Sequence, residues 1–199
     1  MRQLEVTYKS VVRRKFPNPV AIFGSARYSN DHPVWRATND LAYALGKNGC
    51  SILTGGGPGV MAAANFGAFA ANARSVGFRI CLPSEQCDKP VQWHSDTFNF
   101  EDFHFRQESL IRNAERYVVM PGGFGTLYEL YNVLTLMQCQ KMPKSTVWLY
   151  GRDHFAGHLD LAEEFAMART INFADLNLFK VTDNIEDIIE DINDGFNSR

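Results

Sequence analysis

The alternation of short apolar runs with longer amphipathic segments is the sequence feature that most constrains the fold. From Pro19 onward, each run rich in apolar or β-branched residues is followed by a segment with helical periodicity. The expected strands are residues 20–24, 51–54, 76–82, 117–120, 146–150 and 179–181. The expected helices are residues 34–47, 60–71, 105–115, 127–139, 158–169 and 185–196. This order predicts repeated βαβ units around a parallel sheet.

The expected strands are nearly continuous in apolar residues, which is typical of strands that are covered on both faces. We therefore predict an α/β fold with a doubly wound, Rossmann-like parallel sheet and helices on both faces. Residues 84–99 are polar and irregular. We expect them to form a loop over the carboxyl edge of the sheet that serves as a lid.

Composition limits the domain organisation and the partners. With 199 residues and 45% hydrophobic content, the chain is long enough to form a single domain over residues 1–199. The formal net charge is −2 and no long run of like charges occurs, so we expect no nucleic-acid partner. No apolar stretch is long enough to span a membrane, so we expect no membrane partner and a cytoplasmic location.

Glycine-bearing turns follow three of the expected strands. They read Gly24-Ser25-Ala26-Arg27, Thr54-Gly55-Gly56-Gly57-Pro58-Gly59 and Pro121-Gly122-Gly123-Phe124-Gly125-Thr126. Glycine lets several backbone N–H groups converge on one phosphate, and the positive end of a helix dipole adds to the attraction. Ligands of open α/β sheets bind at the carboxyl ends of the strands, where these turns lie. The expected phosphate- and substrate-binding residues are Gly24, Ser25, Arg27, Thr54, Gly55, Gly56, Gly57, Gly59, Met61, Gly122, Gly123, Gly125 and Thr126.

Two members of this set have a second interpretation. Arg27 is either a phosphate clamp or a solvated surface group, and its position after the first turn favours the clamp. Met61 either lies against a base or fills the core.

Tyr128 and Tyr131 have the spacing of a helix face and are expected to pack rather than to bind a ligand.

Glu129 and Arg106 are the predicted catalytic residues. Thr126 and Glu129 have the spacing of a capping box, so a plain helix N-terminus is the alternative for that pair. However, one helical turn would bring Glu129 close to the anion site, where Arg106 can pair with a phosphate, a ribose oxygen or Glu129. A carboxylate can stabilise an oxocarbenium-like state and orient or deprotonate water, so the pair suggests cleavage of a glycosidic bond.

Other nucleotide chemistries fit the sequence less well. The segment Gly57-Pro58-Gly59-Val60-Met61-Ala62 matches a loose dinucleotide motif, but the ribose-binding acid expected about 20 residues later is missing. No lysine follows a glycine turn, which argues against a P-loop. We expect no cofactor.

No metal site is expected either. The cysteines are far apart and form no CxxC pair, so buried free thiols are expected at Cys50, Cys81, Cys87 and Cys139. His154 and His158 have the spacing of one helix face, but Gly157 weakens that helix and no third ligand is apparent.

These turns, together with Arg106 and Glu129, resemble the Lonely Guy family, whose hallmark is PGGxGTxxE. Here the hallmark reads Pro121-Gly122-Gly123-Phe124-Gly125-Thr126 with Glu129, and the match runs in order from about Val20 to Lys141. Members were long mislabelled lysine decarboxylases. The chain lacks a lysine in the setting that a pyridoxal Schiff base requires.

The resemblance implies a hydrolase for cytokinin riboside 5′-monophosphates or AMP that releases the free base and ribose 5-phosphate. It places Arg106 and Glu129 at the catalytic positions and implies a small-molecule nucleotide substrate and a homodimer or higher homo-oligomer. The chain has Gln107 where the family usually has lysine, and Ala62 where relatives often have glutamate. Molybdenum-cofactor carrier proteins resemble the same fold and turns, so a non-catalytic nucleotide-binding or carrier protein is the alternative.

Overall fold

The fold is organised around one parallel β-sheet. The computed structural model describes residues 7–80 and 91–197. Within these residues the strands are β1 (Thr7–Tyr8), β2 (Pro19–Phe23), β3 (Ser51–Thr54), β4 (Ser75–Ile80), β5 (Asp96–Phe100), β6 (Arg116–Val119), β7 (Val147–Tyr150) and β8 (Phe179–Thr182). They lie in the order β1-β5-β4-β3-β2-β6-β7-β8, and every neighbouring pair is parallel.

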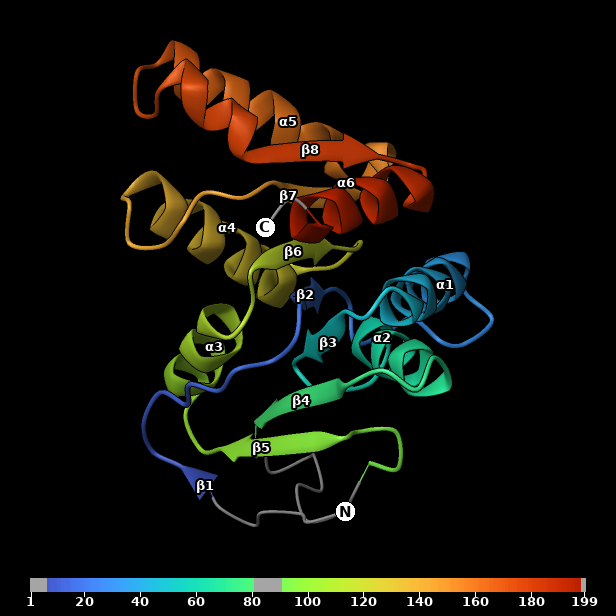
Figure 1. Cartoon of the computed structure of the whole chain (residues 1–199). Helices are drawn as coiled ribbons and strands as arrows, with labels where there is room; N and C mark the ends of the chain where they lie inside the picture. The colour runs from blue at the N-terminus through green and yellow to red at the C-terminus, as the bar shows by residue number, and fades with distance from the viewer. Residues whose placement is uncertain (1–6, 81–90, 198–199) are drawn as a thin grey trace.

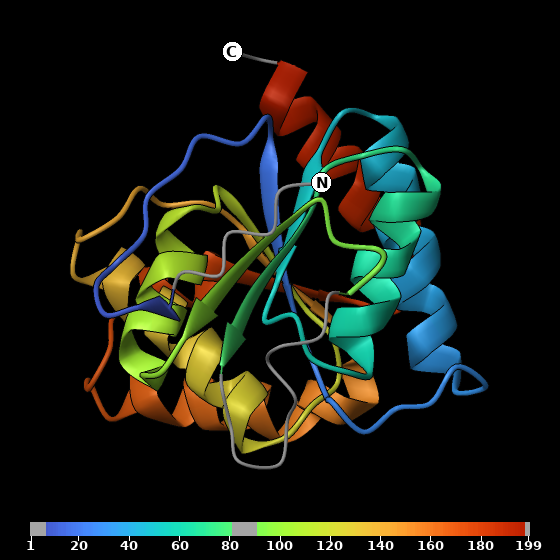
Figure 2. The same ribbon diagram turned by 90° about the horizontal axis from the view of Figure 1, so that it is seen from below.

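Helices cover both faces of this sheet (Figures 1 and 2). They are α1 (Pro33–Lys47), α2 (Val60–Ala70), α3 (Phe103–Arg112), α4 (Phe124–Gln138), α5 (Arg152–Met167), the 3-10 helix η1 (Phe173–Leu178) and α6 (Ile185–Asn197). Val20 and Ile22 of β2 pack with residues of α1, α2 and α6, whereas Ala21 and Phe23 pack with residues of α3, α4 and α5. Alternate side chains of a strand point to opposite faces, so β2 is buried on both sides. The predicted doubly wound, Rossmann-like sheet is confirmed.

The strand order places a topological switch point between β2 and β6. From β2 the chain winds through β3, β4 and β5 on one side, and then crosses by α3 to β6 on the other side. The connections that leave β2 and β6 therefore separate, and a crevice opens between the carboxyl ends of these strands. Ser25 N donates to Pro121 O at 3.1 Å across this point.

Several sequence-based boundaries were wrong. Residues 96–99, expected in a loop, belong to β5, which pairs along its whole length with β4. Polar residues interrupt the apolar residues of β5, so it lacks the continuous apolar run by which the other strands were predicted. Residues 91–95 enter at the amino end of the sheet, where Ser95 N donates to Ser75 O at 2.7 Å, and not over the carboxyl edge. Residues 81–82 of an expected strand and 84–90 of the expected lid lie outside the described residues.

α5 begins at Arg152, six residues earlier in the chain than the predicted start at 158. Asp183, which is distant in the sequence, stabilises this first turn, because its Oδ1 atom accepts from Arg152 N at 2.8 Å. Gly157 lies inside the helix. Among the described residues, no helix has both the length and the apolar character needed to cross a membrane.

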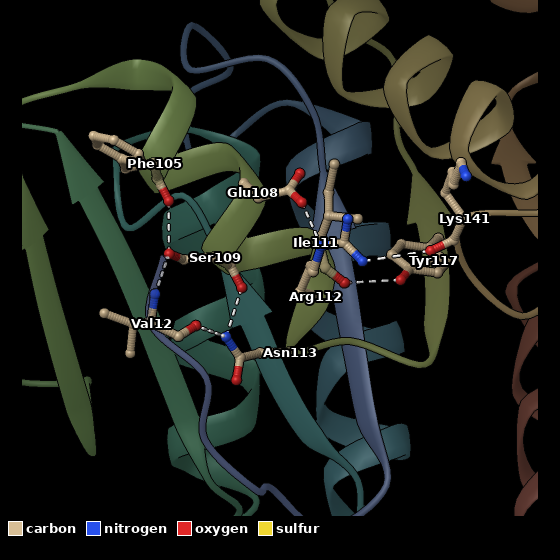
Figure 3. A network of polar contacts seen from close by, with 9 residues as sticks. All are labelled: Val12, Phe105, Glu108, Ser109, Ile111, Arg112, Asn113, Tyr117 and Lys141. Carbon is tan, nitrogen blue, oxygen red and sulfur yellow. Dashed lines mark hydrogen bonds and ion pairs between the residues drawn. The ribbon is translucent and has the colours of Figure 1, made fainter. Parts of the chain in front are cut away.

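A network of polar contacts fixes α3, the helix that carries Arg106 (Figure 3). Ser109 Oγ accepts from Val12 N at 2.8 Å, and Asn113 Nδ2 donates to Val12 O at 2.6 Å. The Tyr117 hydroxyl of β6 donates to Ile111 O at 2.9 Å. Each buried hydrogen bond of this kind is worth about 1 kcal/mol, and together they hold α3 between the N-terminal segment and β6.

Candidate functional site

A cleft of about 830 Å³ opens at the switch point between β2 and β6. Its wall consists of Gly24, Ser25, Ala26, Arg27, Tyr28, Met61, Phe103, Arg106, Gln107, Gly122, Gly123, Phe124, Gly125, Thr126, Leu127, Tyr128, Glu129 and His154. The first and third glycine turns therefore meet in one place, together with the predicted catalytic pair. A volume of this size is typical of small-molecule sites.

Arg106 and Glu129 face each other on this wall. Arg106 Nη1 lies 3.6 Å from Glu129 Oε1, and the two side chains are only 9% and 12% exposed. Burial raises the pKa of Glu129 to about 7, although the neighbouring Arg106 acts in the opposite direction. Desolvation thus outweighs the ion pair, and near neutral pH this carboxyl group can either hold or accept a proton.

A hydrogen bond to β4 and close packing against Gly55 hold the guanidinium of Arg106 in place. Arg106 Nε donates to Phe78 O of strand β4 at 2.7 Å. A Cβ atom on Gly55 would lie 1.8 Å from Arg106 Nη2 and 2.7 Å from Met61 Sδ. Gly55 therefore provides the space in which the arginine lies, and it does so without lining the cleft itself.

α4 begins at the cleft without a side-chain cap. Its N-cap residue is Gly123 and its first residue is Phe124, and no side chain of the described residues accepts from its first turn. Thr126 and Glu129 therefore lie inside the helix, and the capping-box interpretation was wrong. Uncapped N–H groups and the positive end of a helix dipole are the features that attract anions to helix N-termini.

The second glycine turn packs against residues that line the cleft and does not line the cleft itself. The Thr54 hydroxyl is buried, bonds to Asn65 Oδ1 at 2.5 Å and accepts from Gly56 N at 2.9 Å. Gly59 has a φ of 68°, and a Cβ there would lie 2.3 Å from Ser25 O. Thr54, Gly55, Gly56, Gly57 and Gly59 are not part of the cleft wall, unlike the other predicted binding residues.

Several wall residues were missed or read differently from the sequence. Tyr28, Phe103, Phe124 and Tyr128 line the cleft, and Phe124 is 94% exposed. Tyr128, expected to pack, is half exposed at the wall. Local periodicity identifies helix faces but does not indicate which face meets a cleft, so no sequence signal marked these aromatic residues.

Gln107 and His154 add polar groups to the wall. Gln107 is 2% exposed, and its Nε2 atom finds no hydrogen-bond partner among the described residues. His154, in the first turn of α5, brings Nε2 within 3.1 Å of Gly122 N. The early start of α5 places His154 here, and no local sequence signal marks that start.

The described residues contain no cluster of three or more histidine, cysteine or acidic side chains suited to a metal ion. His154 contacts Gly122, and the Nδ1 atom of His158 lies 3.5 Å from the Tyr131 hydroxyl. Cys50 is a buried free thiol, as predicted, whereas the free thiol of Cys139 is exposed and the prediction of burial was wrong there. Cys81 and Cys87 lie outside the described residues.

Fold and cleft together define the class of this protein: a Rossmann-like α/β protein with a ligand cleft at the switch point of its sheet. A family model described as "Possible lysine decarboxylase" matches residues 61–192. The chain belongs to this family.

Two curated relatives are similar in sequence. The cytokinin riboside 5′-monophosphate phosphoribohydrolase LOG5 of Arabidopsis thaliana is 28% identical over 105 residues, which are 51% of this chain and 45% of the relative. The matched part thus spans less than half of that protein. The probable cytokinin riboside 5′-monophosphate phosphoribohydrolase LOG4 of Oryza sativa subsp. japonica is 22% identical, over 85% of this chain and 74% of the relative.

Solved structures of molybdenum-cofactor proteins share the fold. The molybdenum cofactor carrier protein of Chlamydomonas reinhardtii has a TM-score of 0.66 at 18% identity, with 94% of this chain and all of the other chain covered. The molybdenum cofactor binding protein of Rippkaea orientalis has a TM-score of 0.62 at 22% identity, with 89% and 94% covered. At these identities the likeness is one of fold.

The decarboxylase in the family's description does not fit the cleft. A pyridoxal enzyme needs a lysine amine to form its Schiff base. No lysine is among the described residues of the wall, where the cationic side chains are Arg27 and Arg106.

Proposed function

We propose that the protein hydrolyses the N-glycosidic bond of a purine nucleoside 5′-monophosphate, releasing the free base and ribose 5-phosphate. The observation that carries this proposal is the buried Arg106–Glu129 pair, which opens on the cleft beside the uncapped end of α4. An acidic group next to an anion-binding position suits a substrate with a phosphate at one end and a glycosidic bond a few ångströms away.

The phosphate would bind at the N-terminus of α4. The backbone N–H groups from Gly123 to Gly125 are free of side-chain caps, and Arg27 lies on the same wall. Backbone amides, the helix dipole and an arginine together favour a phosphate monoester. The exposed rings of Phe124 and Tyr128 flank this position and suit the flat face of a purine base.

Glu129 would act on the reacting carbon. When the C1′–N9 bond breaks, its electrons leave with the base, which takes up a proton, and positive charge develops on the ribose. The Glu129 carboxylate stabilises that charge and accepts a proton from the water that adds to C1′. Arg106 Nη1, 3.6 Å from Glu129 Oε1, keeps the carboxylate in place and lowers its proton affinity.

The raised pKa of Glu129 gives this reaction a pH dependence. With a pKa of about 7, the carboxylate form becomes dominant only above neutral pH. The rate should therefore rise as the pH increases through about 7. A general base with a pKa near the working pH is well matched to proton transfer.

A non-catalytic nucleotide or molybdenum-cofactor carrier is the second candidate. The likeness in fold to carrier proteins supports it, and so does Gln107, a neutral side chain with an unpartnered amide at the wall. A carrier would bind its ligand tightly and release it unchanged.

Product analysis separates the two candidates. The purified protein is incubated with AMP and with isopentenyladenosine monophosphate, and free base and ribose 5-phosphate are followed by chromatography. Equal amounts of both products from either nucleotide would support the hydrolase and rank the substrates. Tight binding of the nucleotide, with no base released over many hours, would favour the carrier.

A further inference from the structure

Gln107 brings a buried amide without a hydrogen-bond partner to the wall of the cleft. The residue is 2% exposed, and its Nε2 atom has no partner among the described residues. It nevertheless lines the cleft, next in sequence to Arg106. An unpaired buried amide is costly, because it has given up its hydrogen bonds to water and gained none in return. An oxygen atom of a ligand in the cleft would supply the missing bond.

The amide of Gln107 is not needed for the packing of α3. Leu110 and Ile111 lie one turn further along the helix and are buried in the core. Residues three and four apart share a helix face, so Gln107 belongs to the same apolar face. An apolar side chain would continue this face without leaving a polar group unpaired. The amide is thus placed where the buried face of α3 leaves the core and reaches the cleft.

α3 holds the amide in a fixed position. Ser109 Oγ accepts from Val12 N at 2.8 Å, and Asn113 Nδ2 donates to Val12 O at 2.6 Å (Figure 3). These bonds tie the helix to the N-terminal segment just beyond Gln107. A ligand that meets the amide therefore meets a donor that is already in place, which lowers the cost of binding.

The buried part of the wall is left for the sugar of a bound nucleotide. In the proposed complex the phosphate lies at the N-terminus of α4, and the base lies against the exposed rings of Phe124 and Tyr128. Glu129, which would act at C1′ of the sugar, is 12% exposed and lies 3.6 Å from Arg106. Gln107 follows Arg106 on the same wall and is buried as well.

We propose that Gln107 is a specificity-determining residue that bonds to a ribose hydroxyl and so selects ribonucleotides over their deoxy analogues. The proposal rests on the proposed function, because it takes the ligand to be a nucleoside 5′-monophosphate. A glutamine amide has a donor end and an acceptor end, and a hydroxyl group can bond to either. A site that is left with an unpaired polar group when a hydroxyl is missing rejects the analogue that lacks it.

The experiment measures the binding of AMP, 2′-deoxy-AMP and 3′-deoxy-AMP to the E129Q variant by titration calorimetry. This variant lacks the carboxylate that the proposed reaction requires, so the nucleotides stay intact. The analogue that lacks the contacted hydroxyl should bind about tenfold more weakly than AMP, because one hydrogen bond to a buried amide is lost.

Two double variants show whether the preference depends on Gln107. Methionine is similar in shape and has no amide, so in E129Q/Q107M the preference for AMP should disappear. Gln138 of α4 lies outside the cleft wall, and its Nε2 atom donates to Asp175 Oδ2 at 2.9 Å. E129Q/Q138M therefore removes a glutamine amide elsewhere and should keep the preference.

The outcomes separate recognition from a structural role for the amide. Equal binding of AMP and both analogues to E129Q, or an unchanged preference in E129Q/Q107M, would overturn the proposal. Removing an unpaired amide should leave the urea midpoint of Q107M at or above that of the wild type, and a lower midpoint would show that the amide bonds within the protein instead. Base release by the wild type tests the hydrolase separately, because a preference for AMP without base release would reject hydrolysis and leave the role of Gln107 intact.

Discussion

Replacing Glu129 by glutamine tests how strongly burial acts on this carboxyl group. Its side chain is 12% exposed, and burial raises its pKa from 4.5 to about 7. Between these two values the unfolded chain gives up the proton before the folded chain does. Raising the pH therefore favours unfolding, and the stability that the protonated group provides below pH 4.5 is lost as the pH rises through 7.

The size of the effect follows from the pKa values. A tenfold change in proton affinity is worth about 1.4 kcal/mol, so between pH 5 and pH 8 the wild type should lose roughly 2 to 3 kcal/mol of unfolding free energy relative to E129Q. Glutamine has nearly the same shape and no titratable proton. The difference between the two proteins isolates Glu129 from all other groups, including His94, whose pKa burial lowers to about 4.

Urea unfolding of both proteins from pH 5 to pH 8, followed by circular dichroism, gives this difference directly. E163Q, which removes an exposed carboxylate from α5, serves as the control for loss of one surface charge. The quantity to follow is the unfolding free energy of the wild type minus that of E129Q. If it stayed constant within about 0.5 kcal/mol from pH 5 to pH 8, or increased with pH, desolvation would not outweigh Arg106 and the reasoning would be refuted.

Four further substitutions test the local packing of the chain and the charge of the cleft wall. Gly55→Ala would place a carbon 1.8 Å from the guanidinium of Arg106, so turnover should fall at least tenfold. Gly157→Ala has open space around the new carbon, and it should stabilise α5 by up to about 1 kcal/mol in urea unfolding. Gly77→Ala would place a carbon 2.3 Å from the buried His94 ring, and should lower the unfolding free energy by about 2 kcal/mol. Gln107→Lys adds a cation at the wall and should tighten phosphate binding severalfold in calorimetry, with unchanged binding contradicting contact at this position.

The sequence was sufficient to predict the sheet and the meeting of two glycine turns. Strands that are apolar throughout, such as β2, imply helices on both faces, and parallel strands bring their carboxyl ends to one edge. The proximity of Arg106 and Glu129 followed from the same reasoning, because each lies in a helix next to that edge.

Strand order limited the rest of the site prediction. The turns after β2 and β6 flank the crevice because these strands are neighbours, whereas β3 lies on the far side of β2 from β6. The turn from Thr54 to Gly59 therefore packs against the wall of the cleft without lining it, although it is as rich in glycine as an anion-binding loop. Nothing in the local sequence specifies which strands become neighbours.

Long-range contacts explain the remaining errors. Helical periodicity near Gly157 suggested a late start for α5, but Asp183 holds an earlier first turn and so brings His154 to the cleft. α4 begins at Phe124 rather than at Leu127, which places Thr126, the expected N-cap, inside the helix and removes the capping box. For α5 the start of the helix thus depends on a neighbour that is distant in sequence.

Base release by the Glu129→Ala variant is the most direct test of the central claim. Wild type and variant are incubated with AMP and with isopentenyladenosine monophosphate above pH 7, where the carboxylate form of Glu129 dominates. We expect the wild type to release base and ribose 5-phosphate in equal amounts, and the folded variant to release no base above the uncatalysed background. Base release by the variant at the wild-type rate would contradict the assignment of the reaction to Glu129.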